Sequence, residues 1–355
     1  MRVLHLFSNH KFTGPADPAL VLAGAIRHAG PAVTWASGPA PDGGRSVRTI
    51  AEERGLPVLP GLAMRKHGRP LPWIHDVVRL RRWLGEGRFD LVHAHLPNDH
   101  HIAAVAARGL DVPVVRSLYD LEPPRGRRAR TSLGRSARLF VPTEGARERL
   151  AAAAPTRADT IEVVPPALDL GRFGTTRDPA IRSAWGIPDG DFVVGVVARM
   201  QLHRRFPELI EGFARAARAD TRLHLVILGR GTNQRIVAHE PAARSGVGDR
   251  IHFPGYIDPT AYPGTLPAFD ALVFLVPGSD GTCRAAREAQ ACGVPVIAAP
   301  RGLLPELIAP DESGLLLTND EPDTIAAAIR NLREDPDRRR SLAAGARRFA
   351  EQRYD

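Results

Sequence analysis

Residues 276–307 read VPGSDGTCRAAREAQACGVPVIAAPRGLLPEL, and this stretch decides the fold. It follows an apolar run (271–276) typical of a buried strand and continues through a turn, a helix and a second apolar strand at 294–299. We expect Asp280 at the start of the helix and Glu288 just over two turns later, so that both carboxylates share one face. Free N–H groups at a helix start bind anions, and carboxylates accept hydrogen bonds from hydroxyls. The stretch therefore predicts a site for a ligand with phosphates and hydroxyls, such as a nucleotide sugar.

Short apolar runs alternate with helical stretches along the whole chain, a pattern typical of parallel sheets covered by helices. The Pro- and Gly-rich stretch 164–180, VPPALDLGRFGTTRDPA, is interpreted as a linker between two domains. The predicted fold class is α/β, with two Rossmann-like doubly wound domains, residues 1–170 and 171–355, facing each other across a cleft. The strand candidates are 3–7, 32–35, 91–94, 112–116, 139–141 and 161–164 in the first domain, and 192–197, 223–228, 251–253, 272–276, 294–298 and 315–317 in the second.

Composition restricts the function further. The 355 residues suffice for two domains, and no apolar run approaches the roughly 18 residues that a membrane helix needs. Cys283 and Cys292 are expected to be buried free thiols in a reducing compartment. No G-x-G-x-x-G follows the first strand, which argues against a dinucleotide-dependent oxidoreductase. No aromatic and basic platform for nucleic acid is present in the sequence.

The net charge of +9 is concentrated in the first half of the chain. Residues 1–170 hold 24 Lys and Arg against 16 Asp and Glu, a difference of +8, whereas residues 171–355 hold 24 against 23, a difference of +1. The first half is therefore expected to meet an anionic partner, such as a membrane surface or a phosphate-bearing acceptor.

The run from Glu288 to Val296, EAQACGVPV, resembles the donor-site signature of retaining glycosyltransferases of family 4, which have the GT-B architecture. The family usually has Glu where this chain has Asp280, and Phe-Gly-Leu where it has Thr282-Cys283-Arg284. The resemblance implies that Glu288 accepts hydrogen bonds from the ribose and that Asp280 recognises hydroxyls of the transferred sugar. A solvated helix residue for Glu288, and a plain helix N-cap for Asp280, are the alternative interpretations.

Other positions that match the family form the rest of the expected donor site. Arg199 and Arg204 take the positions of its diphosphate-binding Arg and Lys, and Arg205 stands where the family has Gly; surface arginines of an Arg-rich chain are the alternative. The catalytic set is thus Arg199, Arg204, Asp280 and Glu288. The expected donor-binding residues are Gly14, Gly229, Tyr256, Gly281, Thr282, Cys283 and Arg284.

The first half is expected to hold the acceptor. The run 89–95, FDLVHAH, matches the family's Asp-x-Val-His-x-His strand end and places His95 on the acceptor side, with Tyr119 and Asp120 after the next strand. Many members have His where this chain has Tyr119, and Tyr donates a hydrogen bond but carries no charge near neutral pH. The two histidines of the run suggest either a metal or a packing and hydrogen-bonding role; the family pattern is metal-free.

Residues 71–84, LPWIHDVVRLRRWL, have apolar residues at helical spacing with arginines between them. Such a helix either lies on a membrane surface near lipid-linked acceptors or packs on the sheet through Trp73, Val77, Leu80 and Leu84.

The resemblance implies a metal-independent hexosyltransferase-like enzyme that retains anomeric configuration and takes a UDP- or GDP-sugar, with no cofactor. A sugar or lipid-linked acceptor in cell-envelope assembly, a cytoplasmic location and peripheral contact with the inner membrane face are expected. The alternative is a catalytically decayed GT-B homologue that binds a nucleotide or a partner without transferring sugar.

Overall fold

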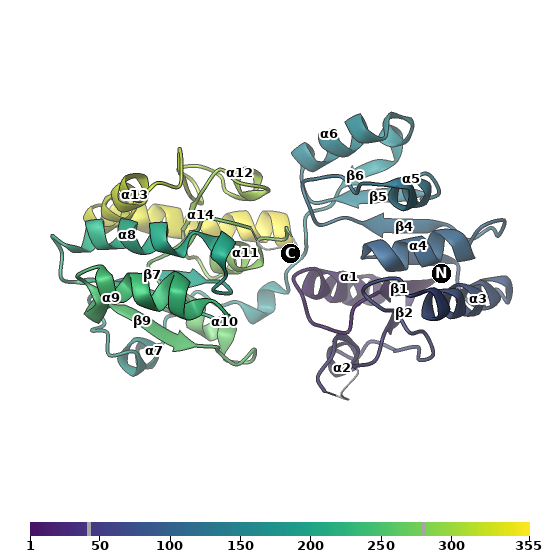
Figure 1. Cartoon of the computed structure of the whole chain (residues 1–355), viewed down its shortest axis with the longest axis horizontal. Coiled ribbons are helices and arrows are strands. Elements are labelled where there is room, and N and C mark those ends of the chain that lie inside the picture. Colours follow the sequence, from purple (N-terminus) through teal and green to yellow (C-terminus); the bar gives the residue numbers. More distant parts are fainter. Residues whose placement is uncertain (41–43, 278–280) are drawn as a thin grey trace. The chain divides into compact units, whose positions relative to one another are not determined.

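The computed structural model describes residues 1–40, 44–277 and 281–355. The chain folds into two compact units, the first formed mainly by Met1–Leu168 and the second mainly by the residues from Asp169 on (Figure 1). In the described part of the chain no helix is long and apolar enough to cross a membrane.

The first unit is a parallel six-stranded sheet in the order β2-β1-β3-β4-β5-β6, with helices packed against it. Its strands are β1 (Arg2–Phe7), β2 (Ala32–Ser37), β3 (Leu91–Ala94), β4 (Val114–Ser117), β5 (Arg138–Val141) and β6 (Ile161–Val163). Its helices are α1 (Ala16–His28), α2 (Val47–Glu53), α3 (Pro70–Gly85), α4 (Pro97–Ala106), α5 (Arg127–Leu133), α6 (Glu144–Ala153) and the 3₁₀ helix η1 (Pro155–Thr160).

The second unit repeats this plan, with a parallel sheet in the order β12-β11-β10-β7-β8-β9. Its strands are β7 (Phe192–Val197), β8 (Leu223–Leu228), β9 (Ile251–Gly255), β10 (Ala271–Phe274), β11 (Val296–Ala298) and β12 (Gly314–Leu316). Its α-helices are α7 (Pro179–Ala184), α8 (Phe206–Ala217), α9 (Glu240–Arg244), α10 (Tyr262–Thr265), α11 (Arg284–Ala291), α12 (Leu304–Leu307), α13 (Pro322–Glu334) and α14 (Pro336–Tyr354). It also has the 3₁₀ helices η2 (Leu170–Arg172), η3 (Leu202–Arg204), η5 (Gly248–Arg250) and η6 (Leu266–Ala268) and the π-helix η4 (Arg235–His239).

All twelve predicted strands are present, with ends that differ by no more than two residues from the predicted ones. Two of them, β4 and β11, begin later than predicted because Pro113 and Pro295 precede them and proline has no N–H to donate to a sheet. The predicted fold class, α/β with two parallel sheets, is confirmed.

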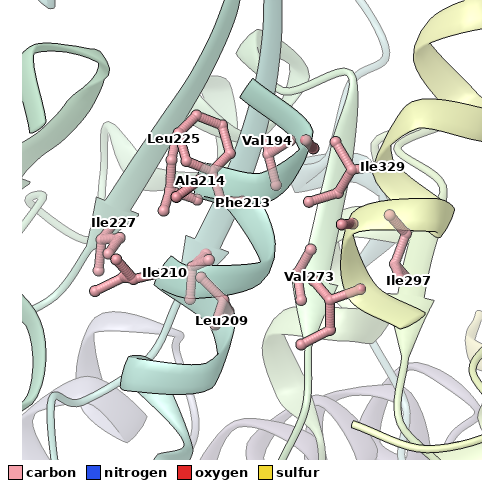
Figure 2. Close-up of a cluster of buried hydrophobic side chains, with 14 of the residues drawn as sticks. Val194, Leu209, Ile210, Phe213, Ala214, Leu225, Ile227, Val273, Ile297 and Ile329 are labelled. Atoms are coloured by element: carbon pink, nitrogen blue, oxygen red, sulfur yellow. The ribbon is translucent and has the colours of Figure 1, made fainter. Parts of the chain in front are cut away.

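The core of the second unit lies where α8 and α13 cover one face of its sheet. Figure 2 shows Leu209, Ile210 and Phe213 of α8 packed among strand residues such as Leu225 and Val273. Each fully buried side chain of this kind contributes roughly 1.5–3 kcal/mol. This packing fixes β7, β8 and β10, from whose carboxyl ends the site loops emerge.

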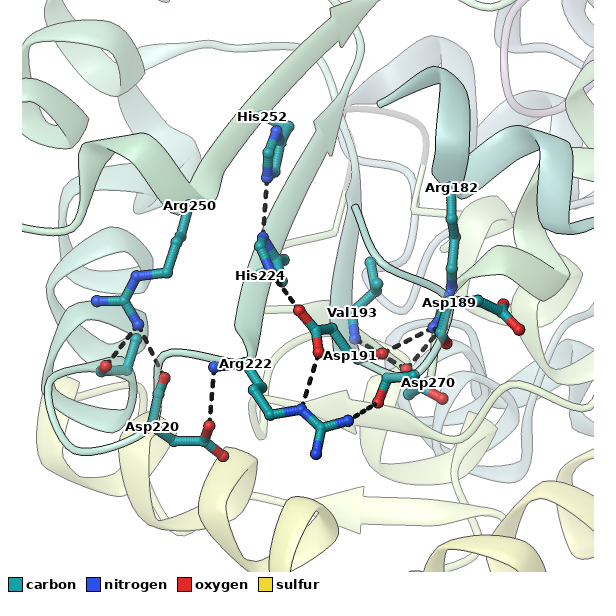
Figure 3. A network of polar contacts seen from close by, with 12 residues as sticks. Arg182, Asp189, Asp191, Val193, Asp220, Arg222, His224, Arg250, His252 and Asp270 are labelled. Atoms are coloured by element: carbon teal, nitrogen blue, oxygen red, sulfur yellow. Dashed lines mark hydrogen bonds and ion pairs between the residues drawn. The ribbon is translucent and has the colours of Figure 1, made fainter. Parts of the chain in front are cut away.

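A polar network closes the opposite, amino-terminal edge of the same sheet (Figure 3). Asp191 accepts a hydrogen bond from Arg222 at 2.9 Å and lies 3.1 Å from His224, which lies 3.1 Å from His252. Nearby, the buried Arg182 forms an ion pair of 2.7 Å with Asp270. The polar groups of this network are hydrogen-bonded or ion-paired to one another. We therefore interpret this edge as stabilising the fold and do not assign it a role in binding.

Candidate functional site

The predicted donor-site residues of the second unit lie at the carboxyl edge of its sheet. Arg199 follows β7 and is exposed, Gly229 follows β8, and Tyr256 follows β9. Because all strands of the sheet are parallel, their exits meet along one edge, where ligands of such folds bind. The structure thus brings these residues to the same edge as Arg204 and Val276, which lies just beyond β10.

The side chain of Arg204 connects the segments that follow β7 and β10. It ends η3 after β7, and its Nη1 donates a hydrogen bond of 2.6 Å to the carbonyl of Val276, just beyond β10. The guanidinium is half-buried. One cation is therefore fixed beside the end of β10.

Arg205 occupies the position where the family has Gly. Its φ of 56° is left-handed, a conformation that favours glycine. The side chain reaches Asp320 at 2.8 Å and Glu208 at 3.3 Å, and Arg301 shares the same Asp320 carboxylate at 2.7 Å. The strain of an arginine here is thus offset by ion pairs that hold η3 to the loop before α13.

Glu288 lies on α11, and only 3% of the residue is exposed. Its Oε1 is 3.2 Å from Nε of Arg284, one turn earlier, and its Oε2 accepts a hydrogen bond of 2.9 Å from the hydroxyl of Tyr262 on α10. The interpretation of Glu288 as a solvated helix residue is therefore wrong. A carboxylate with both oxygens engaged is held in one orientation, as recognition of a pair of hydroxyls requires.

Tyr262 was not predicted to belong to the site. It lies 26 residues before Glu288 in the chain, and no motif marks it. Burial and the nearby Glu288 charge raise the pKa of its phenol well above the ordinary value, so the phenol stays protonated and donates. Its participation follows only from the packing of α10 against α11.

The expected helix start at Asp280 is wrong. The helix α11 spans Arg284–Ala291, because Gly281 (φ 68°) and Cys283 (φ 47°) are left-handed and cannot continue a right-handed helix. Asp280 lies outside the described residues, and it does not share α11 with Glu288. Thr282 and Cys283 are buried, and Arg284, the first residue of the helix, is partly exposed.

Glycine is required at Gly229. Its φ is 133°, and a Cβ atom there would lie 2.3 Å from the carbonyl oxygen of Ala198. Next to it, the guanidinium of Arg230 stacks over the ring of Tyr256, 4.7 Å from the centroid, and that ring is largely exposed. The exits of β7, β8 and β9 thus pack against one another and present an exposed aromatic ring.

Both cysteines are buried and free, as predicted. Cys283 precedes α11 and Cys292 follows it. Burial raises the pKa of the Cys292 thiol to about 12, so it remains protonated and unreactive.

The first unit contains a chain of hydrogen bonds that begins at Tyr119. Its hydroxyl lies 2.8 Å from Nδ1 of His95, and Nε2 of His95 lies 2.9 Å from Nδ1 of His5 on β1. His93, two residues before His95, pairs instead with Ser117 at 2.8 Å. The hydrogen-bonding role expected for His95 is present, and His5 is a partner that the sequence did not suggest.

His5, His93 and His95 also form the one group, among the described residues, with the spacing of metal ligands. One nitrogen of each lies within 4.8 Å of the others. Burial lowers the pKa of His5 to about 3 and lowers those of His93 and His95 well below the ordinary value, so all three rings are neutral. Both ring nitrogens of His95 already have hydrogen-bond partners, which supports the packing and hydrogen-bonding interpretation.

The remaining predicted residues of this unit lie at its surface. Asp120 is exposed directly after β4 and Tyr119, and Gly14 is half-buried in the turn before α1. The buried Asp99 accepts hydrogen bonds from the backbone of Ser8 at 2.7 Å and of Leu96 at 2.8 Å, which joins the exits of β1 and β3. Burial raises the pKa of Asp99 to about 6 although Arg116 is nearby.

Both halves of the chain match models of known protein families. The family model described as "Glycosyl transferases group 1" matches residues 177–349, and "Glycosyltransferase Family 4" matches residues 19–172. The chain is 30% identical over 298 residues to the D-inositol 3-phosphate glycosyltransferase of Frankia alni, covering 76% of this chain and 72% of that protein. It is 30% identical to the protein of the same name from Stackebrandtia nassauensis, covering 77% of this chain and 66% of that protein.

Solved structures share the fold. Anabaena Alr3699/HepE, crystallised in complex with UDP, aligns with a TM-score of 0.81 at 20% identity, covering 100% of this chain and 96% of that one. A glycosyltransferase from Rickettsia africae also aligns with a TM-score of 0.81, at 13% identity, covering 100% of this chain and 94% of that one.

Proposed function

The chain belongs to the glycosyl transferases group 1, with the two-domain α/β fold of GT-B enzymes, and we propose that it transfers a sugar from a nucleotide-diphosphate sugar to an acceptor hydroxyl with retention of configuration. Residues 1–170 bind the acceptor and residues 171–355 bind the donor, a UDP- or GDP-sugar. The observation that carries the proposal is the buried Glu288 carboxylate, oriented by Tyr262 and Arg284 at the carboxyl edge of the second sheet.

Glu288 holds the donor by its ribose. A buried carboxylate forms strong hydrogen bonds with a pair of hydroxyls because little water competes for its oxygens. Tyr262 and Arg284 position this carboxylate and limit its freedom to rotate. Tyr256 and the loop at Gly229 lie at the exits of neighbouring strands, where they are available to the nucleotide.

Arg199 and Arg204 hold the diphosphate. During transfer the bond from the anomeric carbon to the phosphate oxygen breaks, and negative charge grows on the diphosphate. Fixed cations stabilise this charge more in the transition state than in the ground state, which lowers the barrier. The 2.6 Å bond from Arg204 to the Val276 carbonyl fixes that cation before the substrate arrives.

The acceptor oxygen forms its bond to the anomeric carbon on the face that the diphosphate leaves, and its proton passes to an oxygen of the leaving diphosphate. Asp280 forms hydrogen bonds with hydroxyls of the transferred sugar, and Gly281, Thr282, Cys283, Arg284 and Gly14 bind the donor. On the acceptor side, Tyr119, oriented by His95, and Asp120 form hydrogen bonds with the acceptor. No metal or cofactor takes part in the proposed reaction.

The acceptor is a sugar, a lipid-linked sugar or a phosphate-bearing polyol. The name of the relatives, D-inositol 3-phosphate glycosyltransferase, and the basic first half of the chain both favour an acceptor that carries phosphate. We place the enzyme in the cytoplasm, in cell-envelope assembly, with peripheral contact at the inner membrane face.

A binding module without turnover is the second candidate. Departures from the family pattern favour it, because Thr282, Arg204, Arg205 and Tyr119 all fall on positions of the expected donor and acceptor sites. Release of UDP or GDP from a nucleotide sugar in the presence of phosphate-bearing polyols separates the two candidates. Release that depends on Glu288 supports transfer, whereas tight nucleotide binding without release under any acceptor supports the binding module.

A further inference from the structure

The helix α3 has two apolar faces. Its inner face packs into the core of the first unit through Trp73, Val77, Leu80, Trp83 and Leu84. Its outer face carries Leu71, Ile74 and Val78, which are 80%, 52% and 62% exposed. The packing interpretation of this helix is thus correct for the inner face, and it leaves the outer face without an explanation.

The three outer residues form one stripe. They are spaced by three and four positions, so they lie on the same side of the helix and extend over about 10 Å of its length. Exposed leucine, isoleucine and valine side chains that gather in this way mark a surface that binds something apolar.

The two carboxylates of α3 and its C-cap, Asp76 and Glu86, do not present unpaired negative charge on this surface. The buried Asp76 points inward and accepts hydrogen bonds from the backbone of Ala63 at 2.7 Å and of Met64 at 2.9 Å. Glu86 is exposed but pairs with Arg82 at 2.7 Å. The exposed cations between residues 65 and 88 are Arg65, Lys66, Arg69, Arg79, Arg81, Arg82 and Arg88.

The positive charge continues onto α5. His101 of α4 stacks on Trp73 of α3 with ring centroids 5.4 Å apart. A Cβ atom at Gly68 would lie 3.9 Å from Nη1 of Arg128 and 3.9 Å from Cδ1 of Trp73, so Arg128 of α5 lies close to the start of α3. The side chain of Arg128 is exposed.

We propose that this face of the first unit, the α3 surface, docks on an anionic lipid bilayer. Leu71, Ile74 and Val78 enter the boundary between headgroups and acyl chains, and the surrounding cations contact the lipid phosphates; this arrangement is that of helices that lie in a membrane interface. A bilayer fits better than a protein partner because single apolar side chains need no shaped pocket in lipid, and long cationic side chains adapt to mobile headgroups. The inference rests on the proposed function, which includes peripheral membrane contact, and it names the residues that make this contact.

The test is co-sedimentation of the full chain with vesicles of phosphatidylcholine, with and without about 30 mol% phosphatidylglycerol. The variants are Leu71→Gln/Ile74→Gln/Val78→Gln and Lys66→Glu/Arg69→Glu. The matched control is Val164→Gln/Ile236→Gln, which changes two exposed apolar residues elsewhere. All the changed side chains are exposed, so the variants are expected to fold, which circular dichroism checks.

The wild type and the control should bind anionic vesicles at least about tenfold more tightly than neutral ones, and high salt should weaken the binding. Both variants of the α3 surface should bind anionic vesicles about tenfold more weakly than the wild type does. Equal binding to both vesicle types, no binding to either, or full binding by the triple variant would overturn the proposal. A complex with an acidic protein in place of vesicle binding would overturn it too and assign the surface to a protein partner. Nucleotide binding, measured separately without lipid, tests the proposed function and is expected to be the same in all these variants.

Discussion

The hydroxyl of Tyr262 donates a hydrogen bond of 2.9 Å to Oε2 of Glu288, 26 residues later in the chain. The bond joins α10 to α11 and fixes the carboxylate at the carboxyl edge of the sheet. A tyrosine without any motif therefore supports the residue that we place against the donor ribose.

Replacing Tyr262 by Phe tests this support. The change removes a hydrogen bond to a buried carboxylate and leaves the ring in place, so we expect about 1–3 kcal/mol less stability and nucleotide affinity reduced about tenfold. Calorimetry and urea unfolding measure the two effects.

The matched control is Tyr354→Phe. Tyr354 is also buried, and its hydroxyl makes only long hydrogen bonds, of 3.4 Å, to Gln290 and Leu307. Its loss should leave nucleotide affinity unchanged. Equal affinity losses in both variants would show that Tyr262 acts only through the stability of the unit.

Arg204 should matter for turnover more than for binding. Arg204→Ala removes a fixed cation from the leaving diphosphate, and we expect kcat to fall by about 10²–10³. Arg204→Lys keeps the charge but not the planar fork, and should recover part of this loss. Steady-state release of nucleotide measures both, with Arg218→Ala, an exposed arginine at the end of α8, as the control. Normal turnover in Arg204→Ala would remove this residue from the mechanism.

Gly229 tests whether the exit of β8 needs close backbone contact. Gly229→Ala places a Cβ atom 2.3 Å from the Ala198 carbonyl at a left-handed φ, so we expect a loss of roughly 2 kcal/mol or more in the free energy of unfolding. Gly264→Ala in α10, where a Cβ atom meets nothing within 4 Å, should be neutral or stabilising. Urea unfolding of both variants decides; a fully stable Gly229→Ala protein would contradict the close approach of this loop to Ala198.

Acid should destabilise the first unit. The pKa values of His5, His93 and His95 are lowered on folding, so the unfolded chain binds more protons below about pH 6.5, and stability falls as the pH falls from there. Asp99, with its pKa raised to about 6, opposes part of this effect, because the folded state takes up its proton first. From pH 7.5 to pH 5.5 these four groups should together cost about 3 kcal/mol.

Urea unfolding at the two pH values measures this cost. His93→Gln should reduce the pH dependence by about one proton. A wild-type stability that does not change between the two pH values would contradict the neutral, buried histidine cluster.

The sequence predicts the framework well because each parallel strand is a short apolar run between turn residues. The runs 192–197 and 223–228 therefore coincide with β7 and β8. The start of α11 was predicted wrongly because Cys283 has a left-handed conformation, which its residue type does not indicate as a glycine would. Tyr262 and His5 were missed because each meets its partner only through packing between elements, at separations of 26 and 90 residues.

The central claim is that Glu288 binds the donor nucleotide, and calorimetry of UDP and GDP with the wild type and Glu288→Gln tests it most directly. Glu334→Gln, an exposed position at the end of α13, is the matched control. We predict that one nucleotide binds the wild type and the control in the micromolar range, and that Glu288→Gln, still folded, weakens its binding by at least about tenfold. Undiminished binding to Glu288→Gln, or no binding of either nucleotide to the wild type, would contradict the account.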